Sequence, residues 1–405
     1  MSIARTHAPA SRAEIALAAR GPHVFFVSAA LFGALVLAEW VVATHLGWAD
    51  GVPPVMWHAH ELVYGFAAAA LAGVVSAWVP DWSGTPRART TRIYALAGIW
   101  FLGRIAAAVS ALLPPWLVAA IDLSFFPTLA ALIVIPCLAA RPKKNLPLLA
   151  LIMVLCLGNF AMHAEAFGGT FTLAERGARI GVDAYLLLIA VVCGNAIPDA
   201  TNRFFTDRGT PLQIRPMPIL NGFAIAALLV YLLSDGVWGM SRPTSAAALA
   251  AGVLNFMRLL RWQGYRTLGT PAVAILHLGY LWLVVGLLLE AAVPITNGVA
   301  DMAAIHALTG AVGTLVLAAV AHENMVHSGN SVRAERPLLA AYALVLIAIV
   351  LRIAALFVPG AFVNLIIASG AVWSLGYFCL VGSYVTASLG FSDAGRSPRE
   401  HREHV

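Results

Sequence analysis

Trp57-His58-Ala59-His60-Glu61 opens an otherwise apolar segment that continues to about Val79. A run of about twenty apolar residues is long enough for a helix to cross a bilayer. Two imidazoles and a carboxylate at the start of such a run are costly to place in hydrocarbon, which indicates that they have a function. The segment therefore predicts both a membrane helix and the first candidate site.

The composition assigns the whole chain to a membrane environment. Of its 405 residues, 60% are hydrophobic and 11% are charged, and the mean hydropathy is +0.84. These values leave too few charges to solvate a soluble globule of this length, so we expect lipid to cover much of the surface. The basic residues stand in short clusters between apolar runs, a pattern that favours membrane orientation over nucleic-acid binding.

The four cysteines, Cys137, Cys156, Cys193 and Cys379, stand singly in apolar runs. The sequence contains no C-x-x-C pair for zinc or redox chemistry and no C-x-x-C-H sequence for covalent haem attachment. We therefore expect these cysteines to be small packing residues, and any haem to be bound noncovalently.

Apolar runs of about 17–25 residues recur along the chain, and each is long enough to cross a bilayer as one helix. We expect an all-α polytopic membrane protein, a bundle of about 12 transmembrane helices near residues 22–46, 55–79, 92–113, 116–138, 146–167, 179–198, 217–233, 243–261, 271–291, 300–321, 337–357 and 360–389. This single transmembrane domain, 22–390, lies between a cytoplasmic N-terminal tail, 1–21, and a disordered C-terminal tail, 391–405. A loop around 199–216 divides the helices into two sets of six.

Alternate connections carry 20 of the 25 basic residues, among them Arg87/Arg89/Arg92, Arg203/Arg208/Arg215 and Arg258/Arg261/Arg266. Cytoplasmic loops of membrane proteins retain arginine and lysine, so these connections and both termini are predicted to lie in the cytoplasm. The alternation also assigns a membrane depth to each ionisable side chain. It puts His58, His60 and Glu61 at the outer end of the second helix, and His163 and Glu165 at the outer end of the fifth.

His306 is expected about a turn and a half inside the tenth helix, at the same outer level. Four acids, Glu39, Asp122, Asp183 and Glu290, are expected in the outer halves of their helices. Arg352 is expected near them, and Arg104 close to the middle of the membrane. Ligating histidines need acceptors and buried anionic groups need arginines, so this polar layer predicts a cofactor chamber or a water-filled transport vestibule. Residues two apart on a helix point about 200° from each other, so His58 and His60 serve two adjacent centres, or only one of them ligates.

Three further histidines, His277, His322 and His327, map to the cytoplasmic ends of their helices. They predict a second, inner site. For His277 and His322, a bond to a backbone carbonyl or a place among lipid headgroups is an equally good interpretation.

The motifs around these residues resemble one protein family. The matching stretches are Trp57-His58-Ala59-His60-Glu61, Gly65-Phe66-Ala67-Ala68-Ala69, Pro80-Asp81-Trp82-Ser83-Gly84, His163-Ala164-Glu165-Ala166, Leu276-His277-Leu278-Gly279-Tyr280-Leu281-Trp282, His306-Ala307-Leu308-Thr309-Gly310 and His327-Ser328-Gly329. In this order they resemble the NnrS family of bacterial membrane proteins. The family's characteristic histidines carry over to His60, His163, His277, His306 and His327.

The resemblance implies a twelve-helix protein of the bacterial inner membrane that contains haem b and copper. It also implies an association with the response to nitric oxide and with denitrification. Two positions depart from the family, because His322 and Asn195 stand where arginines are expected. If those arginines bind haem carboxylates, one cofactor is altered or absent in this chain.

Together, the residues and the resemblance lead to a hypothesis for the site. An outer metal centre is held by His60, His163 and His306, with His58 as a further ligand or a supporting group. Glu61 and Glu165 orient imidazoles or relay protons, with His322 as a further supporting group. Arg104 or Arg352 pairs with haem propionates, and His277 and His327 form the inner centre.

Several functions remain compatible with this site. A protein that handles nitric oxide could turn it over as a membrane oxidoreductase, sequester it or sense it. A metal or haem delivery factor for a respiratory enzyme would use the same ligands without catalysis. A secondary transporter also has twelve helices with ionisable residues near its substrate path.

Overall fold

A computed structural model describes residues 22–46, 54–140, 142–296, 299–328 and 336–394. Every regular element in these ranges is helical, which confirms the prediction of an all-α protein. The predicted tail 1–21 lies outside the described residues, and so do residues 395–405 of the predicted tail 391–405. The last helix continues to Ala394. The cytoplasmic location of both termini stays a prediction.

A helix lies over each of the twelve predicted ranges, and some of these helices are interrupted. The α-helices are α2 (His23–Leu46), α3 (Pro54–His60), α4 (Ala67–Ser83), α5 (Thr90–Ala108), α6 (Pro115–Leu123), α7 (Phe125–Leu129), α8 (Ile135–Ala140), α9 (Pro142–His163), α10 (Phe171–Asp207), α11 (Pro218–Trp238), α12 (Arg242–Arg261), α13 (Pro271–Ala292), α14 (Val299–Ser328), α15 (Arg336–Ala354) and α16 (Phe362–Ala394). Two π-helical turns, η1 (Glu61–Phe66) and η3 (Ala130–Val134), join α3 to α4 and α7 to α8.

Within the described residues, ten helices are long and apolar enough to cross a membrane. The protein is therefore a multi-pass membrane protein. The other two predicted spans correspond to α2 and α5. For α2, only the part His23–Ala38 has described side chains, and this part is apolar. The helix α5 carries Arg92 and Arg104, which lower its hydropathy.

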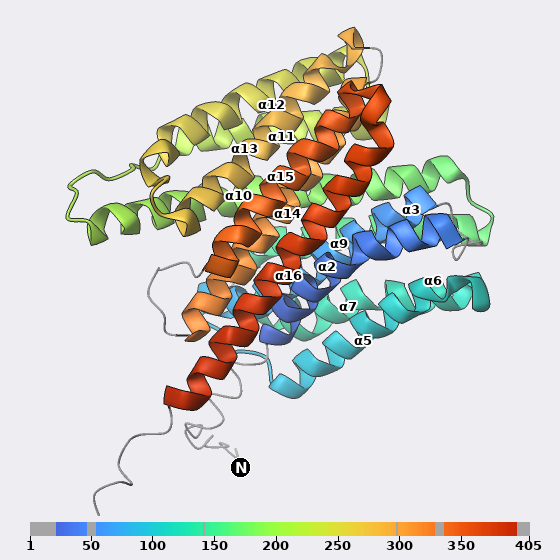
Figure 1. The fold of residues 1–405 in the computed structure, drawn as a ribbon, viewed down its shortest axis with the longest axis horizontal. Coiled ribbons are helices and arrows are strands. Elements are labelled where there is room, and N and C mark those ends of the chain that lie inside the picture. Colours follow the sequence, from blue (N-terminus) through green and yellow to red (C-terminus); the bar gives the residue numbers. More distant parts are fainter. Residues whose placement is uncertain (1–21, 47–53, 141, 297–298, 329–335, 395–405) are drawn as a thin grey trace, which may run out of the picture.

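The helices pack mainly with their neighbours in the sequence, and α2 then packs on α16. This contact joins the two ends of the bundle. In Figure 1, α11 and α12 lie at one side of the molecule and α5, α6 and α7 at the other, with α10 and α14 between them. With 37 residues, α10 is about 56 Å long, well beyond the roughly 30 Å of a hydrocarbon core.

The boundary between the two predicted sets of helices differs from the expectation. We predicted a loop over 199–216, but α10 continues through Pro198 to Asp207. Beyond it, Asn202 in α10 accepts a hydrogen bond from the Ile214 amide at 2.7 Å, which ties the returning segment to the helix. Because α10 also contacts α9, α11, α13 and α14, it joins the two sets instead of ending one of them.

The predicted span 116–138 is interrupted at Ser124, two residues after Asp122. Ser124 separates α6 from α7, and its hydroxyl donates to the Ile121 carbonyl at 2.6 Å. Pro127 then removes one backbone donor from the next turn, and Thr128 donates to the Ser124 carbonyl at 2.7 Å. Asp122 therefore lies near the end of a short helix. Its side chain contacts residues of α5 and α9.

Candidate metal centre and cofactor cavity

The local structure after His60 changes from α-helix to π-helix at Glu61. A π-turn inserts an extra residue into a helix and changes the direction of the side chains around it, and such turns are frequent at functional sites. The Trp100 indole donates to the Gly65 carbonyl within this turn at 2.9 Å. A Cβ atom at Gly65 would lie 2.7 Å from Arg104 Nη1, so this glycine leaves room for the arginine.

Six side chains from five elements meet beside the π-turn. We call them the His–Asp cluster: His60, Glu61, Arg104, Asp122, Asn159 and His163. All are buried except His163, which is partly exposed. Ionisable groups remain in such surroundings only when they are paired or bind a ligand.

Three potential ligand atoms converge within the cluster. Asp122 Oδ2 lies 3.2 Å from His60 Nε2 and 3.1 Å from His163 Nε2, and the three atoms all lie within 4.8 Å of one another. A tetrahedral metal ion with bonds of about 2.0–2.1 Å holds its ligand atoms about 3.3 Å apart. The two distances from Asp122 Oδ2 therefore fit a metal ion bound by two imidazoles and one carboxylate.

The remaining members of the cluster hold these ligands in place. Arg104 donates to Glu61 Oε1 at 2.6 Å and also to Asp122 Oδ1, so the other oxygen of Asp122 faces the histidines. His60 Nδ1 donates to Glu61 Oε1 at 2.8 Å, which directs Nε2 toward Asp122. Carboxylates that bind the second ring nitrogen of a ligating histidine fix its orientation in the same way.

The acceptors around His60 suggest how a cation would enter. Its Nε2 lies 3.0 Å from Asn159 Oδ1 as well as near Asp122, so both ring nitrogens face oxygen atoms. The imidazolium form satisfies them, and a bound cation would replace the proton at Nε2. With neutral imidazoles, the two carboxylates and Arg104 leave one negative charge, which a singly charged ion neutralises.

A mainly apolar cavity lies next to the cluster. It is lined by His58 from α3, His306 from α14 and Arg352 from α15, together with Tyr185 and Trp373. A cavity of this kind, with a few convergent polar groups, is typical of a cofactor or ligand site.

The polar groups of the cavity suit a metal-bearing anionic cofactor. His306 Nδ1 donates to the Met302 carbonyl at 2.6 Å, so its Nε2 carries the lone pair that a metal ion requires. Arg352 Nη1 and the Tyr185 hydroxyl are buried without a hydrogen-bond partner among the described residues. An anionic group in the cavity would satisfy the arginine, which fits the carboxylates of haem.

The structure divides the predicted outer set of histidines in two. His60 and His163 belong to the His–Asp cluster, whereas His58 and His306 line the cavity. His58 and His60 thus face different sites, as one of the two predicted arrangements requires. Arg104 pairs with the carboxylates of the cluster and only Arg352 reaches the cavity.

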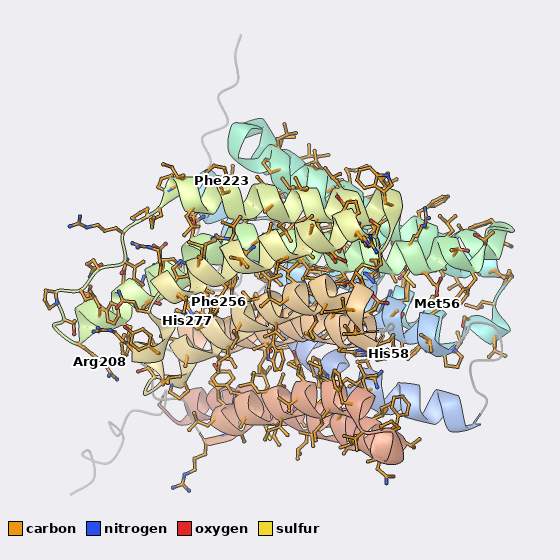
Figure 2. All side chains as sticks on the ribbon, turned by 90° about the horizontal axis from the view of Figure 1, so that it is seen from above. Met56, His58, Arg208, Phe223, Phe256 and His277 are labelled. Atoms are coloured by element: carbon orange, nitrogen blue, oxygen red, sulfur yellow. The ribbon has the colours of Figure 1, made fainter. Side chains whose placement is uncertain are left out.

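The predicted inner site is only partly described. Figure 2 shows His277 toward one end of the helices and His58 toward the other. The Thr201 hydroxyl donates to the Ile197 carbonyl at 2.8 Å, so it accepts from His277 Nε2 at 2.9 Å. His277 Nδ1 is buried without a partner among the described residues.

Of three other predicted residues, only His322 has a described side chain. The side chains of His327 and Glu165 lie outside the described residues. His322 is exposed, and its ring lies edge-on to Trp78 with centroids 6.2 Å apart. Sixteen positions along α14 put His322 about 24 Å from His306.

Two members of the cluster were absent from the predicted site. Asp122 was expected in the outer polar layer but was not named as a ligand, and Asn159 was not singled out. Asn159 precedes His163 by four residues, which puts both on one face of α9. That spacing was the only signal in the sequence, and it does not distinguish a site residue from an asparagine that bonds a backbone carbonyl.

A second polar network joins α10, α11, α13 and α14. Arg179 lies 2.7 Å from Asp301, 3.2 Å from Glu290 and 3.6 Å from Asp235. Its single positive charge faces three carboxylates, two of them buried. These ion pairs link α10 to helices of the second half of the chain.

The fold and the two sites define the class of protein. It is an all-helical, multi-pass membrane protein with a buried histidine–carboxylate centre beside an apolar cavity that contains histidine and arginine. A family model described as NnrS protein matches residues 16–390, nearly the whole chain. The protein therefore belongs to the NnrS family. No match is found among curated proteins.

Proposed function

We propose that this protein is a haem- and copper-containing protein of the bacterial inner membrane that binds or reacts with nitric oxide. Membership of the NnrS family supports this proposal, because the family is associated with bacterial responses to nitric oxide. The multi-pass fold and the two neighbouring candidate sites are compatible with it.

One observation carries the proposal for copper. Nitrogen atoms of His60 and His163 converge on a single oxygen of Asp122 inside the membrane domain. Imidazole is a good copper ligand, and a singly charged copper ion would neutralise the cluster. Glu61 and Arg104 would keep the imidazole and the carboxylate in position, whether or not the ion changes its oxidation state.

The haem would occupy the neighbouring cavity. His58 and His306 would be the residues that hold its iron, and Arg352 would bind a carboxylate group. When bound, haem iron supplies a site that coordinates nitric oxide and exchanges electrons. The apolar lining of the cavity would exclude water and concentrate nitric oxide, which partitions into lipid.

The two sites would act side by side, since His58 and His60 are separated by one residue on the same helical segment. Residues after the π-turn connect them further, because Leu62, Val63 and Phe66 line the cavity. A shift of His60 would therefore also displace residues that line the cavity.

The first experiment is an absorption spectrum and a metal analysis of the purified protein. We expect a haem band that shifts when nitric oxide is added, and copper in a stoichiometric amount. A colourless protein with copper alone would favour metal delivery instead. A colourless, metal-free protein from cells supplied with iron and copper would overturn the proposal.

A second measurement separates binding from turnover. The reduced protein, reconstituted in vesicles with an electron donor and a redox mediator in excess, is mixed with nitric oxide in excess over the protein. Continued consumption indicates an oxidoreductase, whereas uptake of an amount equal to the bound haem indicates sequestration or sensing.

A further inference from the structure

A second cavity lies between the end of α10, the start of α11 and the end of α12. We call it the arginine cavity. Its lining includes three arginines, Arg215, Arg258 and Arg261, and a single carboxylate, that of Asp199. Arg215 and Arg261 are exposed, whereas Arg258 is buried. The cavity thus carries an excess of positive charge.

Arg258 contributes a positive charge without a carboxylate partner among the described residues. Only 2% of its surface is exposed. Its guanidinium donates to Asn221 Oδ1 at 3.0 Å, to the Tyr280 hydroxyl at 2.7 Å and to the Ala190 carbonyl at 3.0 Å. These acceptors are uncharged, so they orient the guanidinium and leave its charge unneutralised. A buried charge of this kind attracts an anion.

The surrounding helices are shaped to hold the Arg258 side chain. A Cβ atom at Gly194 would lie 1.9 Å from Arg258 Nη2, so only glycine allows the guanidinium to lie against α10. The Trp262 ring lies 5.4 Å from the guanidinium carbon. The arginine is therefore held on two sides next to the cavity.

The outer surfaces of α11 and α12 beside this cavity are apolar. Ile219 and Phe223 on α11 are 75% and 63% exposed, and Leu260 on α12 is 57% exposed. Phe256 on α12, labelled with Phe223 in Figure 2, is 40% exposed. Such a surface faces lipid tails in a membrane protein. The arginine cavity thus adjoins a lipid-facing surface.

The basic residues also indicate the side of the membrane. Arg215 belongs to a connection, and Arg261 to the next basic connection, that the charge pattern assigns to the cytoplasm. Anionic lipids are recognised by basic pockets between transmembrane helices on this side. Phosphate is bound well by arginine, which offers paired donors.

We propose that the arginine cavity binds the phosphate group of an anionic phospholipid of the cytoplasmic leaflet. Arg215 and Arg261 contact the phosphate oxygens, and Arg258 supplies the buried positive charge behind them. The acyl chains lie along the apolar surface formed by Ile219, Phe223 and Leu260. Free inorganic phosphate shares the same chemistry, and the test below separates the two sources.

The test is a native mass spectrometry titration of the full chain in an uncharged detergent. The lipid is phosphatidylglycerol, and parallel titrations use phosphatidylcholine and inorganic phosphate. The variant is Arg215→Gln/Arg261→Gln, because these two side chains are exposed and their loss leaves the packing around Arg258 intact. The matched control is Arg89→Gln/Arg92→Gln, which removes two exposed arginines of another predicted cytoplasmic segment.

We expect phosphatidylglycerol to bind the wild-type chain and the control alike. The cavity variant should bind it about 30-fold more weakly, since each arginine near an anionic lipid contributes about fivefold in affinity. Phosphatidylcholine should bind more weakly, and inorganic phosphate should not compete. Equal losses in the two double variants would overturn the proposal, because they would indicate general surface charge. Binding of inorganic phosphate alone, sensitive to the cavity variant, would overturn the assignment to lipid.

Discussion

The imidazole rings of His60 and His163 lie edge to face, with centroids 5.1 Å apart and ring planes inclined at 76°. They come from α3 and α9, and each directs Nε2 toward the same oxygen of Asp122. Two nitrogen atoms and one oxygen atom can therefore bind a single ion without rearrangement of the backbone.

Loss of either imidazole should remove copper. We expect His60→Ala and His163→Ala each to lower the copper content strongly, because the remaining two ligands bind a metal ion poorly. Haem content should stay near that of the wild type, since His58 and His306 are untouched. Metal analysis of the purified variants measures both quantities. Unchanged copper in both variants would exclude the His–Asp cluster as the copper site.

Loss of His306 should have the opposite effect. We expect His306→Ala to lose haem and to retain copper, because His306 lines the cavity and is absent from the cluster. His322→Ala is the matched control on the same helix, with an exposed ring far from the cavity. It should keep both cofactors. Haem loss in the His322 variant as well would indicate that substitutions anywhere in α14 lower the haem content.

Arg352 should affect haem retention more than folding. Its Nη1 has no hydrogen-bond partner among the described residues, so Arg352→Gln breaks no described contact of that atom. We expect weaker haem binding with little change in thermal stability when both proteins are measured without haem. An unchanged rate of haem transfer to an acceptor protein would show that the arginine does not bind the cofactor.

Arg104 should be essential for stability. Arg104→Gln leaves the buried carboxylates of Glu61 and Asp122 without their cation, and breaking a buried ion pair from one side costs about 3–5 kcal/mol. We expect a clear fall in the melting temperature in detergent. The double variant Arg104→Gln/Asp122→Asn restores the net charge of the cluster and should melt at a higher temperature than the single variant. A lower value would mean that charge balance is not the reason.

The close packing of α9 against α10 around Tyr64 can be tested by substituting Gly158 in α9. A Cβ atom at Gly158 would lie 2.3 Å from the Tyr64 hydroxyl, which itself donates to the Gly177 carbonyl at 2.6 Å. Gly158→Ala should destabilise the protein by about 1–3 kcal/mol through overpacking. Adding Tyr64→Phe should recover part of this loss, since the hydroxyl is the contacted atom.

The matched control is Gly98→Ala in α5. No atom lies within 4 Å of a Cβ atom at Gly98, and alanine favours helix by up to about 1 kcal/mol. Its melting temperature should be equal to or above that of the wild type. Equal stability of the Gly158 and Gly98 variants would contradict the close contact at Tyr64.

The sequence predicted the helices better than their interruptions. Hydropathy is a local property, so each apolar run could be read directly as a helix. The π-turn after His60 and the break after Asp122 depend on side chains that satisfy the freed backbone groups, such as Trp100 at Gly65. The prediction that a helix ends near Pro198 was also wrong. Contacts with other segments, which a local pattern does not show, stabilise the extension of α10.

By itself, the sequence determined that the chain is a helical membrane protein with costly histidines at one level of the bilayer. The length of the apolar runs and the alternation of basic connections are sufficient for this conclusion. Both depend on whether lipid or water surrounds each segment. Only the tertiary structure decided which histidine meets which partner. The rotation of each helix about its axis is set by packing against other helices, and that rotation put His60 beside Asp122 and His58 beside the cavity.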